Sequence, residues 1–298
     1  MKRLKPFAYF EPTTLAEALE ILSQKGKEAF PLAGGTDLLV RMKKGEIQPS
    51  VLVNLKRIEG LARIEEEPGK GLRVGALASI AAVEDSSLVG SSHPVLAEAA
   101  GLLGSPSIRQ LATLGGNIGR ASPASDMAPA LLVLQARVLV EGRKGKREVD
   151  VEHIITGPGT TSLAPGEVLT SFFLPNIPPP SGAAYLKLGR REGMDCALVG
   201  VAAFLSLGDK NTGPTEARIA LAAVAPVPLR AKKAEEVLLG GPLTEERIQE
   251  AAQAAADGSL PISDMRASGS YRQEMVRVLT LRALRLALHR AQEGKVIN

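Results

Sequence analysis

The chain has 298 residues, and its 45% hydrophobic content is enough to bury one large core or two to three smaller ones. The formal net charge is +4, but aromatic residues make up 3% of the chain and no basic tract alternates with stacking side chains, so we expect no nucleic-acid partner. The single cysteine excludes an internal disulfide and an iron–sulfur cluster ligated by this chain alone, and the three histidines lie too far apart in sequence to indicate a metal site.

No segment of the sequence is typical of export or of membrane insertion. The N-terminal stretch MKRLKPFAYFEP is basic but lacks a following apolar region, and the apolar stretch ALVGVAAFLSL, which begins at Ala197, is too short to span a bilayer. We therefore expect a cytoplasmic protein without a membrane span.

Strand and helix patterns alternate through the first half of the chain. A capping box formed by Thr14 and Glu17 opens an amphipathic helix over 13–24. Residues 29–42 then read as a short strand, a glycine turn and a helix. Further strands are predicted at 51–55, 71–77 and 137–142, and further helices at 78–85, 93–103 and 128–136.

The proline-rich stretch LPNIPPPSG, Leu174 to Gly182, is the strongest boundary signal, because proline resists both helix and sheet interiors. Beyond it, strands are predicted at 183–190, 197–207 and 216–224. Helices are predicted at 229–240, 244–256 and 271–292. Strands followed by a run of helices indicate a separate α+β C-terminal domain.

Two glycine-containing turns are the candidates for ligand binding. In AGGTD, Ala33 to Asp37, and in TLGGN, Thr113 to Asn117, glycine would allow backbone N–H groups to approach a phosphate. Each turn alone is more often a plain connection, and neither fits the usual dinucleotide or P-loop motif. A pair of such turns, however, would suit a ligand whose pyrophosphate is flanked by large groups.

Both turns resemble the flavin-binding signatures of one family. PLAGGTDLL and TLGGNIGRASPASDMAPALLVLQA are similar to those of the FAD-carrying medium subunits of molybdenum hydroxylases, the group that contains xanthine dehydrogenase and aerobic carbon monoxide dehydrogenase. GEVLTSFFLP, YLKLGRREGMDCALVGVAA and MRASGSYRQEMVRVLTLRALRLAL resemble later motifs of that family in the same order, so the likeness covers almost the whole chain.

The resemblance implies an α+β fold with two domains. Residues 1–177 would form a two-part FAD-binding domain of the vanillyl-alcohol-oxidase (PCMH) type, with subdomains at about 1–58 and 59–177. Residues 181–298 would form a small α+β C-terminal domain of the carbon monoxide dehydrogenase flavoprotein type.

The resemblance also implies a set of FAD-binding residues. The first turn would wrap the pyrophosphate, the second would form another backbone cradle, and Asp126 would accept hydrogen bonds from cofactor hydroxyls. Ser122 would hold the intervening turn, and Asp195 and Cys196 would lie beside the isoalloxazine ring. The full set is Pro31, Leu32, Ala33, Gly34, Gly35, Thr36, Asp37, Leu38, Thr113, Gly115, Gly116, Asn117, Ser122, Asp126, Leu169, Lys187, Asp195 and Cys196.

Three of these residues carry alternative interpretations or departures. Asp126 could instead cap the helix that follows it, and Lys187 could be a solvated lysine on a strand. Some relatives have a tyrosine against the flavin where Cys196 stands here, which leaves the access of an electron acceptor open.

The function that the resemblance implies is that of an oxidoreductase subunit. In this family a molybdenum cofactor on a large subunit oxidises the substrate, [2Fe-2S] clusters on a small subunit pass the electrons on, and FAD delivers them to NAD, a quinone or oxygen. We expect FAD to be bound non-covalently, because no histidine lies in either turn. The molybdenum cofactor and the clusters are expected on the partner subunits alone, and no side chain of this chain is expected to be a general base.

Two other functions stay open at this point. A free-standing FAD-dependent reductase of the enolpyruvyl-glucosamine reductase type would need an acid or serine to protonate its substrate, and no such residue stands out. A binding module that kept the fold but lost the flavin is the non-enzymatic alternative.

Overall fold

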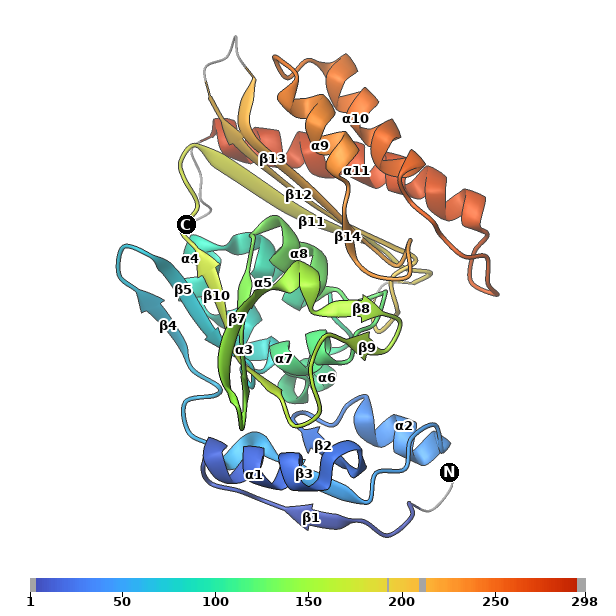
Figure 1. Cartoon of the computed structure of the whole chain (residues 1–298). Helices are drawn as coiled ribbons and strands as arrows, with labels where there is room; N and C mark the ends of the chain where they lie inside the picture. Colours follow the sequence, from blue (N-terminus) through green and yellow to red (C-terminus); the bar gives the residue numbers. More distant parts are fainter. Residues whose placement is uncertain (1–3, 192, 209–212, 294–298) are drawn as a thin grey trace.

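The computed structural model describes residues 4–191, 193–208 and 213–293, and these form three stacked units in chain order (Figure 1). The first unit is a parallel sheet of three strands in the order β1-β3-β2, made of β1 (Ala8–Phe10), β2 (Ala29–Leu32) and β3 (Val51–Asn54). The strands are connected by the helices α1 (Leu15–Lys25) and α2 (Leu38–Lys44) and by the short 3-10 helix η1 (Gly26–Glu28). A second 3-10 helix, η2 (Leu55–Arg57), follows β3.

The predicted Thr14 cap starts α1, but the reciprocal bond of the predicted capping box is shifted by one residue. The Thr14 hydroxyl accepts a hydrogen bond from the Glu17 N–H at 3.2 Å, which satisfies one of the free donors of the first helical turn. The Glu17 carboxylate accepts a hydrogen bond from the N–H of Thr13 at 3.2 Å, rather than from that of Thr14. Leu19 and Leu22 are buried, so the apolar stripe of α1 packs on the small sheet.

The middle unit is an antiparallel sheet of five strands in the order β4-β5-β10-β6-β7. Its strands are β4 (Ile64–Glu67), β5 (Gly71–Gly75), β6 (Arg137–Gly142), β7 (Gly145–Asp150) and β10 (Val168–Pro175). The helices of this unit are α3 (Ile80–Asp85), α4 (Ser87–Ser92), α5 (Pro94–Gly101), α6 (Pro106–Leu111), α7 (Leu114–Gly119) and α8 (Met127–Val133). The unit also contains the 3-10 helix η3 (Val151–His153) and a hairpin formed by β8 (Ile155–Gly157) and β9 (Thr160–Thr161).

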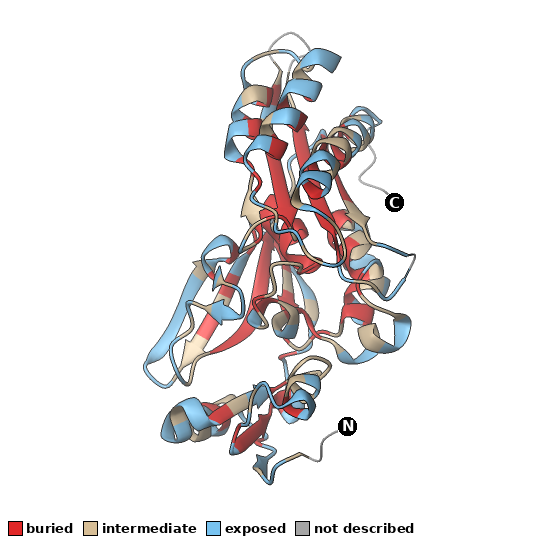
Figure 2. Ribbon diagram, turned by 90° about the vertical axis from the view of Figure 1, so that its right-hand side faces the viewer, coloured by how far each residue is buried: buried red, intermediate tan, exposed pale blue. Residues whose placement is uncertain are grey.

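The third unit is an antiparallel sheet of four strands, β11 (Ser181–Leu188), β12 (Val199–Leu207), β13 (Pro214–Ala222) and β14 (Leu229–Arg230). The helices α9 (Lys232–Leu239), α10 (Glu245–Asp257) and α11 (Gly269–Gln292) cover one face of this sheet (Figure 1). The other face packs against the middle unit, so Ala202 and Phe204 of β12 belong to one core while Val201 and Ala203 belong to the other. This two-sided burial explains why β12 is apolar at nearly every position. The long strands of this sheet are mostly in the colour of buried residues in Figure 2.

The α+β class and the predicted two-part arrangement before a C-terminal α+β unit are confirmed. One predicted helix, 229–240, is wrong at its start, because Leu229 and Arg230 form β14 and α9 begins at Lys232. The Arg230 guanidinium binds the buried Glu235 carboxylate, which also accepts the N–H of Ile219 in β13 at 2.8 Å, and this holds the segment against the sheet edge. None of the described helices is long and apolar enough to cross a membrane.

Candidate functional site

The two glycine turns, far apart in sequence, meet in the structure. A Cβ atom added to Gly34 would lie 1.9 Å from the carbonyl oxygen of Leu111, so the first turn touches the backbone that leads into the second. Only glycine allows this approach. Between the turns lies a cavity of about 460 Å³, which we call the turn cavity.

Most of the residues that the sequence assigns to FAD line the turn cavity. They are Pro31, Ala33, Gly34, Gly35, Thr36, Asp37, Leu38, Thr113, Gly115, Gly116, Asn117, Ser122 and Leu169. Leu32 is instead buried beneath the first turn at 7% exposure. Asp126, Lys187, Asp195 and Cys196 lie elsewhere and are described below.

The first turn leaves backbone donors available. Within the described part of the chain, the N–H groups of Gly34, Gly35 and Thr36 donate no hydrogen bond to another residue. Gly35 has a φ of +73°, a left-handed conformation that favours glycine. Unused N–H groups at the wall of a cavity are suited to bind phosphate oxygens.

The second turn forms the start of the short helix α7, which the sequence did not predict. The Thr113 hydroxyl caps it by accepting the Gly116 N–H at 3.0 Å, and the N–H groups of Leu114 and Gly115 bond to the carbonyls of Ala78 and Ala76. Its donors are therefore already used inside the protein. Gly115 packs closely against Ala76, where a Cβ atom would not fit. Because Gly115 and Gly116 have no side chains, they also leave this part of the turn cavity open.

Ser125 is a site residue that sequence reasoning missed. Its hydroxyl donates to the Asn117 side-chain oxygen and accepts the N–H of Ala128 at 3.1 Å, so it links the second turn to the start of α8. Ser122 holds the intervening turn as predicted, through a bond from the Ala124 N–H to its hydroxyl at 3.2 Å. The serine before an apolar helix was the available signal for Ser125.

Asp126 and Lys187 form a buried ion pair between the middle unit and the third unit. Lys187 Nζ lies 2.9 Å from Asp126 Oδ2 and donates another bond to the Leu102 carbonyl at 2.9 Å, while the Tyr185 hydroxyl donates to Asp126 Oδ1 at 3.0 Å. The Asp126 side chain makes no capping bond to α8, so the interpretation of this residue as a helix cap is wrong. The Lys187 side chain is 7% exposed, so a solvated lysine is also excluded.

Burial controls the protonation of this cluster. Removal from water raises the pKa of Asp126 from its usual value of 3.8, and the Lys187 ammonium opposes that rise. The pKa of Tyr185 is raised well above 10.0, first by burial and then by the Asp126 charge, so its hydroxyl stays a donor at neutral pH.

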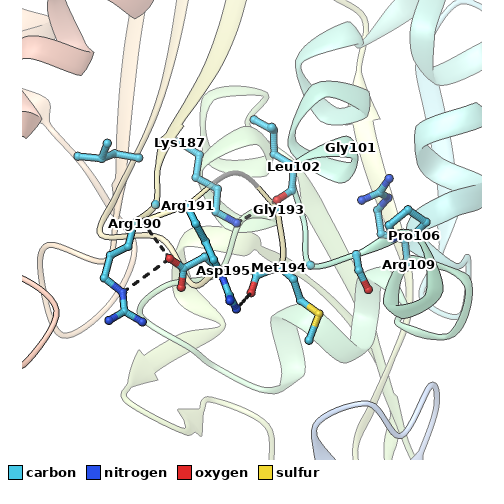
Figure 3. Close-up of a pocket in the computed structure, with 14 residues that line it drawn as sticks. Gly101, Leu102, Pro106, Arg109, Lys187, Arg190, Arg191, Gly193, Met194 and Asp195 are labelled. Atoms are coloured by element: carbon cyan, nitrogen blue, oxygen red, sulfur yellow. Dashed lines mark hydrogen bonds and ion pairs between the residues drawn. The ribbon is translucent and has the colours of Figure 1, made fainter.

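Lys187 also lines a second and larger cavity of about 1000 Å³, which we call the Lys187 cavity (Figure 3). Arg109, Arg190 and Arg191 line it as well, so its wall is rich in positive charge. The segment 102–109, which includes the first turn of α6, contributes to the walls of both cavities, so the two cavities are neighbours.

Asp195 and Cys196 have different surroundings. Asp195 lines the Lys187 cavity, and its Oδ2 accepts the Arg190 N–H at 2.8 Å, a bond that lowers the pKa of Asp195 below 3.8 (Figure 3). Cys196 is exposed and lies on neither of the two cavity walls that we describe.

Arg120 was not singled out from the sequence, although it stands inside the second motif. Its Nε lies 2.7 Å from Asp37 Oδ2, and both residues line the turn cavity. The ion pair joins the two glycine turns directly.

Two family descriptions match the chain. Residues 5–177 match "FAD binding domain in molybdopterin dehydrogenase", and residues 183–287 match "CO dehydrogenase flavoprotein C-terminal domain". The chain is 35% identical over 283 residues to the carbon monoxide dehydrogenase medium chain of Hydrogenophaga pseudoflava, which covers 94% of this chain and 96% of that one. It is 32% identical over 294 residues, 98% of each chain, to the 6-hydroxypseudooxynicotine dehydrogenase complex subunit alpha of Paenarthrobacter nicotinovorans.

Solved structures agree with these matches. A carbon monoxide dehydrogenase structure from Hydrogenophaga pseudoflava has a TM-score of 0.93 at 35% identity, covering 97% of this chain and 99% of that chain. Quinoline 2-oxidoreductase from Pseudomonas putida 86 has a TM-score of 0.89 at 29% identity, covering 98% and 99%.

Proposed function

The chain belongs to the family of FAD-binding medium subunits of molybdenum hydroxylases, and from that membership we propose that it works as the electron-transfer subunit of such a complex. In this proposal a partner subunit with iron–sulfur clusters supplies electrons, and FAD on this chain passes them to an external acceptor. The observation that carries the proposal is the meeting of both glycine turns around one cavity, with unused N–H groups on the first turn.

The turn cavity suits the pyrophosphate part of FAD. The N–H groups of Gly34, Gly35 and Thr36 would bind phosphate oxygens, while Gly115 and Gly116 keep the opposite wall free of side chains. Leu169 and Leu38 give the cavity apolar surface for the remainder of the cofactor. Apolar walls with a few placed polar groups are typical of cofactor sites.

The Lys187 cavity is the proposed site where the flavin of FAD exchanges electrons. Bound FAD supplies the ability to accept electrons singly and release them in pairs. Lys187 would hold one positive charge at the cavity wall, fixed by Asp126 and by the Leu102 carbonyl. Two of its three N–H donors are used in these bonds, so one is left for a ligand. Each Asp126 oxygen has a second lone pair, and a cofactor hydroxyl could bond there too.

The names of the relatives support the proposed partners. One is described as a subunit of a dehydrogenase complex, and others are described as medium chains or medium subunits. We propose a small iron–sulfur subunit and a large molybdenum-cofactor subunit as partners of this chain. NAD, a quinone and oxygen are the candidate acceptors.

Affinity purification of the chain from its native cells tests this function. The expected result is a yellow complex that contains FAD released by acid, together with one protein carrying iron–sulfur clusters and one carrying molybdenum. A yellow chain that purifies alone and reduces an organic substrate at full rate would support a free-standing reductase instead. A colourless chain that takes up no FAD would support a binding module.

A further inference from the structure

Arg120 connects the two glycine turns. It directly follows α7, the helix that begins in the second turn, and its Nε lies 2.7 Å from Oδ2 of Asp37, the last residue of the first turn. Its side chain lines the turn cavity and is 32% exposed. A single ion pair therefore spans the site where the backbones of both turns come together.

The guanidinium of Arg120 keeps its donors unused. It has five N–H groups in a planar fork, and among the residues that the structure describes Asp37 is its one ionic partner, with Oδ2 2.7 Å from Nε. Neither Nε, which is buried, nor the terminal nitrogens make a hydrogen bond to those residues. A Cβ atom on Gly159 would lie 3.6 Å from Nη1, so the β8–β9 hairpin packs against the guanidinium from another side.

The charged residues on the wall of the turn cavity indicate what these free donors would bind. Its charged lining residues are Arg41, Arg120, Asp37 and Glu167. All four are paired: Glu167 with Arg147 at 2.8 Å between Oε2 and Nη2, Arg41 with Glu46 at 3.5 Å, and Arg120 with Asp37 at 2.7 Å. Arg120 differs from Arg41 in its place, because the Arg41 pair lies at the end of α2 whereas the Arg120 pair joins the segments of the two glycine turns. A pyrophosphate is negatively charged. The backbone N–H donors of the first turn are neutral, so they supply no positive charge to offset it.

We propose that Arg120 binds the pyrophosphate of FAD through its terminal N–H groups, and that the Asp37 carboxylate positions the guanidinium by its opposite charge beside Nε. Arginine suits this task because its planar fork matches two phosphate oxygens at once. A carboxylate that fixes the side chain in advance reduces the conformational entropy lost on binding. The inference rests on the proposed FAD site and assigns a role to a residue outside the family-derived set.

The test is a titration of the cofactor-free full chain with FAD, followed by flavin fluorescence, with adenosine diphosphate as a competing probe. For Arg120→Gln we expect the Kd of FAD and of adenosine diphosphate each to rise about tenfold or more, since a charge-assisted bond to phosphate is lost. Arg285→Gln is the matched control, because it also removes one arginine and one exposed ion pair, with Glu245, and should leave both Kd values unchanged.

Asp37→Asn separates direct binding from a purely structural clamp. It cuts the ion pair but keeps the guanidinium, so we expect a smaller rise in Kd than for Arg120→Gln. Equal losses of affinity in both variants, with an equal fall in the melting temperature of the cofactor-free protein, would show that Arg120 acts only as a clamp.

Two further outcomes separate the proposed role of Arg120 from the proposed FAD binding by the chain. An unchanged Kd in Arg120→Gln, with normal FAD binding by the wild type, would overturn the inference alone. A wild-type chain that binds no FAD would overturn the proposed function together with the inference.

Discussion

The Asp126 carboxylate and the Lys187 ammonium are 9% and 7% exposed as side chains, and each depends on the other for its charge to be tolerated. Removing one partner of a buried ion pair costs about 3–5 kcal/mol of unfolding free energy. We expect Asp126→Ala to lose stability in this range, because the Lys187 charge is left without its carboxylate. Urea unfolding of the full chain measures this loss.

The double variant Asp126→Ala with Lys187→Met is the control for this prediction. It removes both charges, and we expect it to recover much of the stability lost in Asp126→Ala. Direct contact with a cofactor hydroxyl, the role implied by the family resemblance, predicts an additional effect. Asp126→Ala would then also weaken FAD binding about tenfold, and the double variant would recover stability without recovering FAD affinity.

His93 gives the protein a predictable response to acid. The Pro175 carbonyl, 2.9 Å from Nε2, can only accept, so Nε2 carries a proton. Nδ1 lies 2.8 Å from the Ser92 hydroxyl, whose single proton is directed to the Leu88 carbonyl at 2.6 Å. Burial lowers the pKa of His93 from its usual value of 6.5. The unfolded chain therefore binds a proton at higher pH than the folded one, and the His93 contribution to stability is lost as pH falls below 6.5.

Replacing the titrating ring isolates this effect. His93→Gln should have lower stability at pH 8, since its hydrogen bonds are changed, but its stability should fall less between pH 6.5 and 5 than that of the wild type. Chemical denaturation at several pH values measures both curves. Parallel curves through this interval would show that His93 does not titrate differently in the folded state.

At the scale of elements, the contact between the two glycine turns is the feature on which the site depends. Gly34→Ala would place a Cβ atom 1.9 Å from the Leu111 carbonyl oxygen, so the turns must move apart. We expect this variant to lose most FAD affinity and to melt at lower temperature. Gly90→Ala is the control, because a Cβ there meets no atom within 4 Å. Normal FAD binding by Gly34→Ala would show that the close contact is dispensable.

The long elements were predictable because their signals are local. The Thr14 cap of α1, the apolar strand β12 and the helix α11 each follow from side-chain pattern and length. The short helix α7 was missed because two glycines are unfavourable in a helix, and the Thr113 cap with buried Leu114 and Ile118 compensates for them.

The candidate site also has parts that could be predicted from the sequence and parts that could not. The glycine turns could be found from sequence, because their composition and the family resemblance both point to them. The Arg120–Asp37 pair and the Tyr185–Asp126–Lys187 cluster could not, because each joins segments that only the folded chain brings together. A sequence pattern identifies a residue type, but its partner depends on tertiary contacts.

In the whole molecule, the C-terminal sheet forms part of the wall of the Lys187 cavity. Tyr185 and Phe204 lie in the same apolar core as residues of the middle unit, and Lys187 extends from β11 into the Lys187 cavity. Arg290 of α11 binds Glu98 of α5 at 2.6 Å across the same boundary. The third unit thus contacts the middle unit both by apolar packing and by an ion pair.

We propose that FAD on this chain receives its electrons from an iron–sulfur partner. The test is stopped-flow mixing of the FAD-loaded chain with the proposed small subunit, reduced beforehand with dithionite and freed of excess reductant. We expect the flavin absorbance to bleach at a rate that rises with the concentration of the small subunit, while the absorbance of the oxidised clusters returns in step. A flavin that stays oxidised in the presence of excess reduced small subunit would show that the electrons do not come from such a partner.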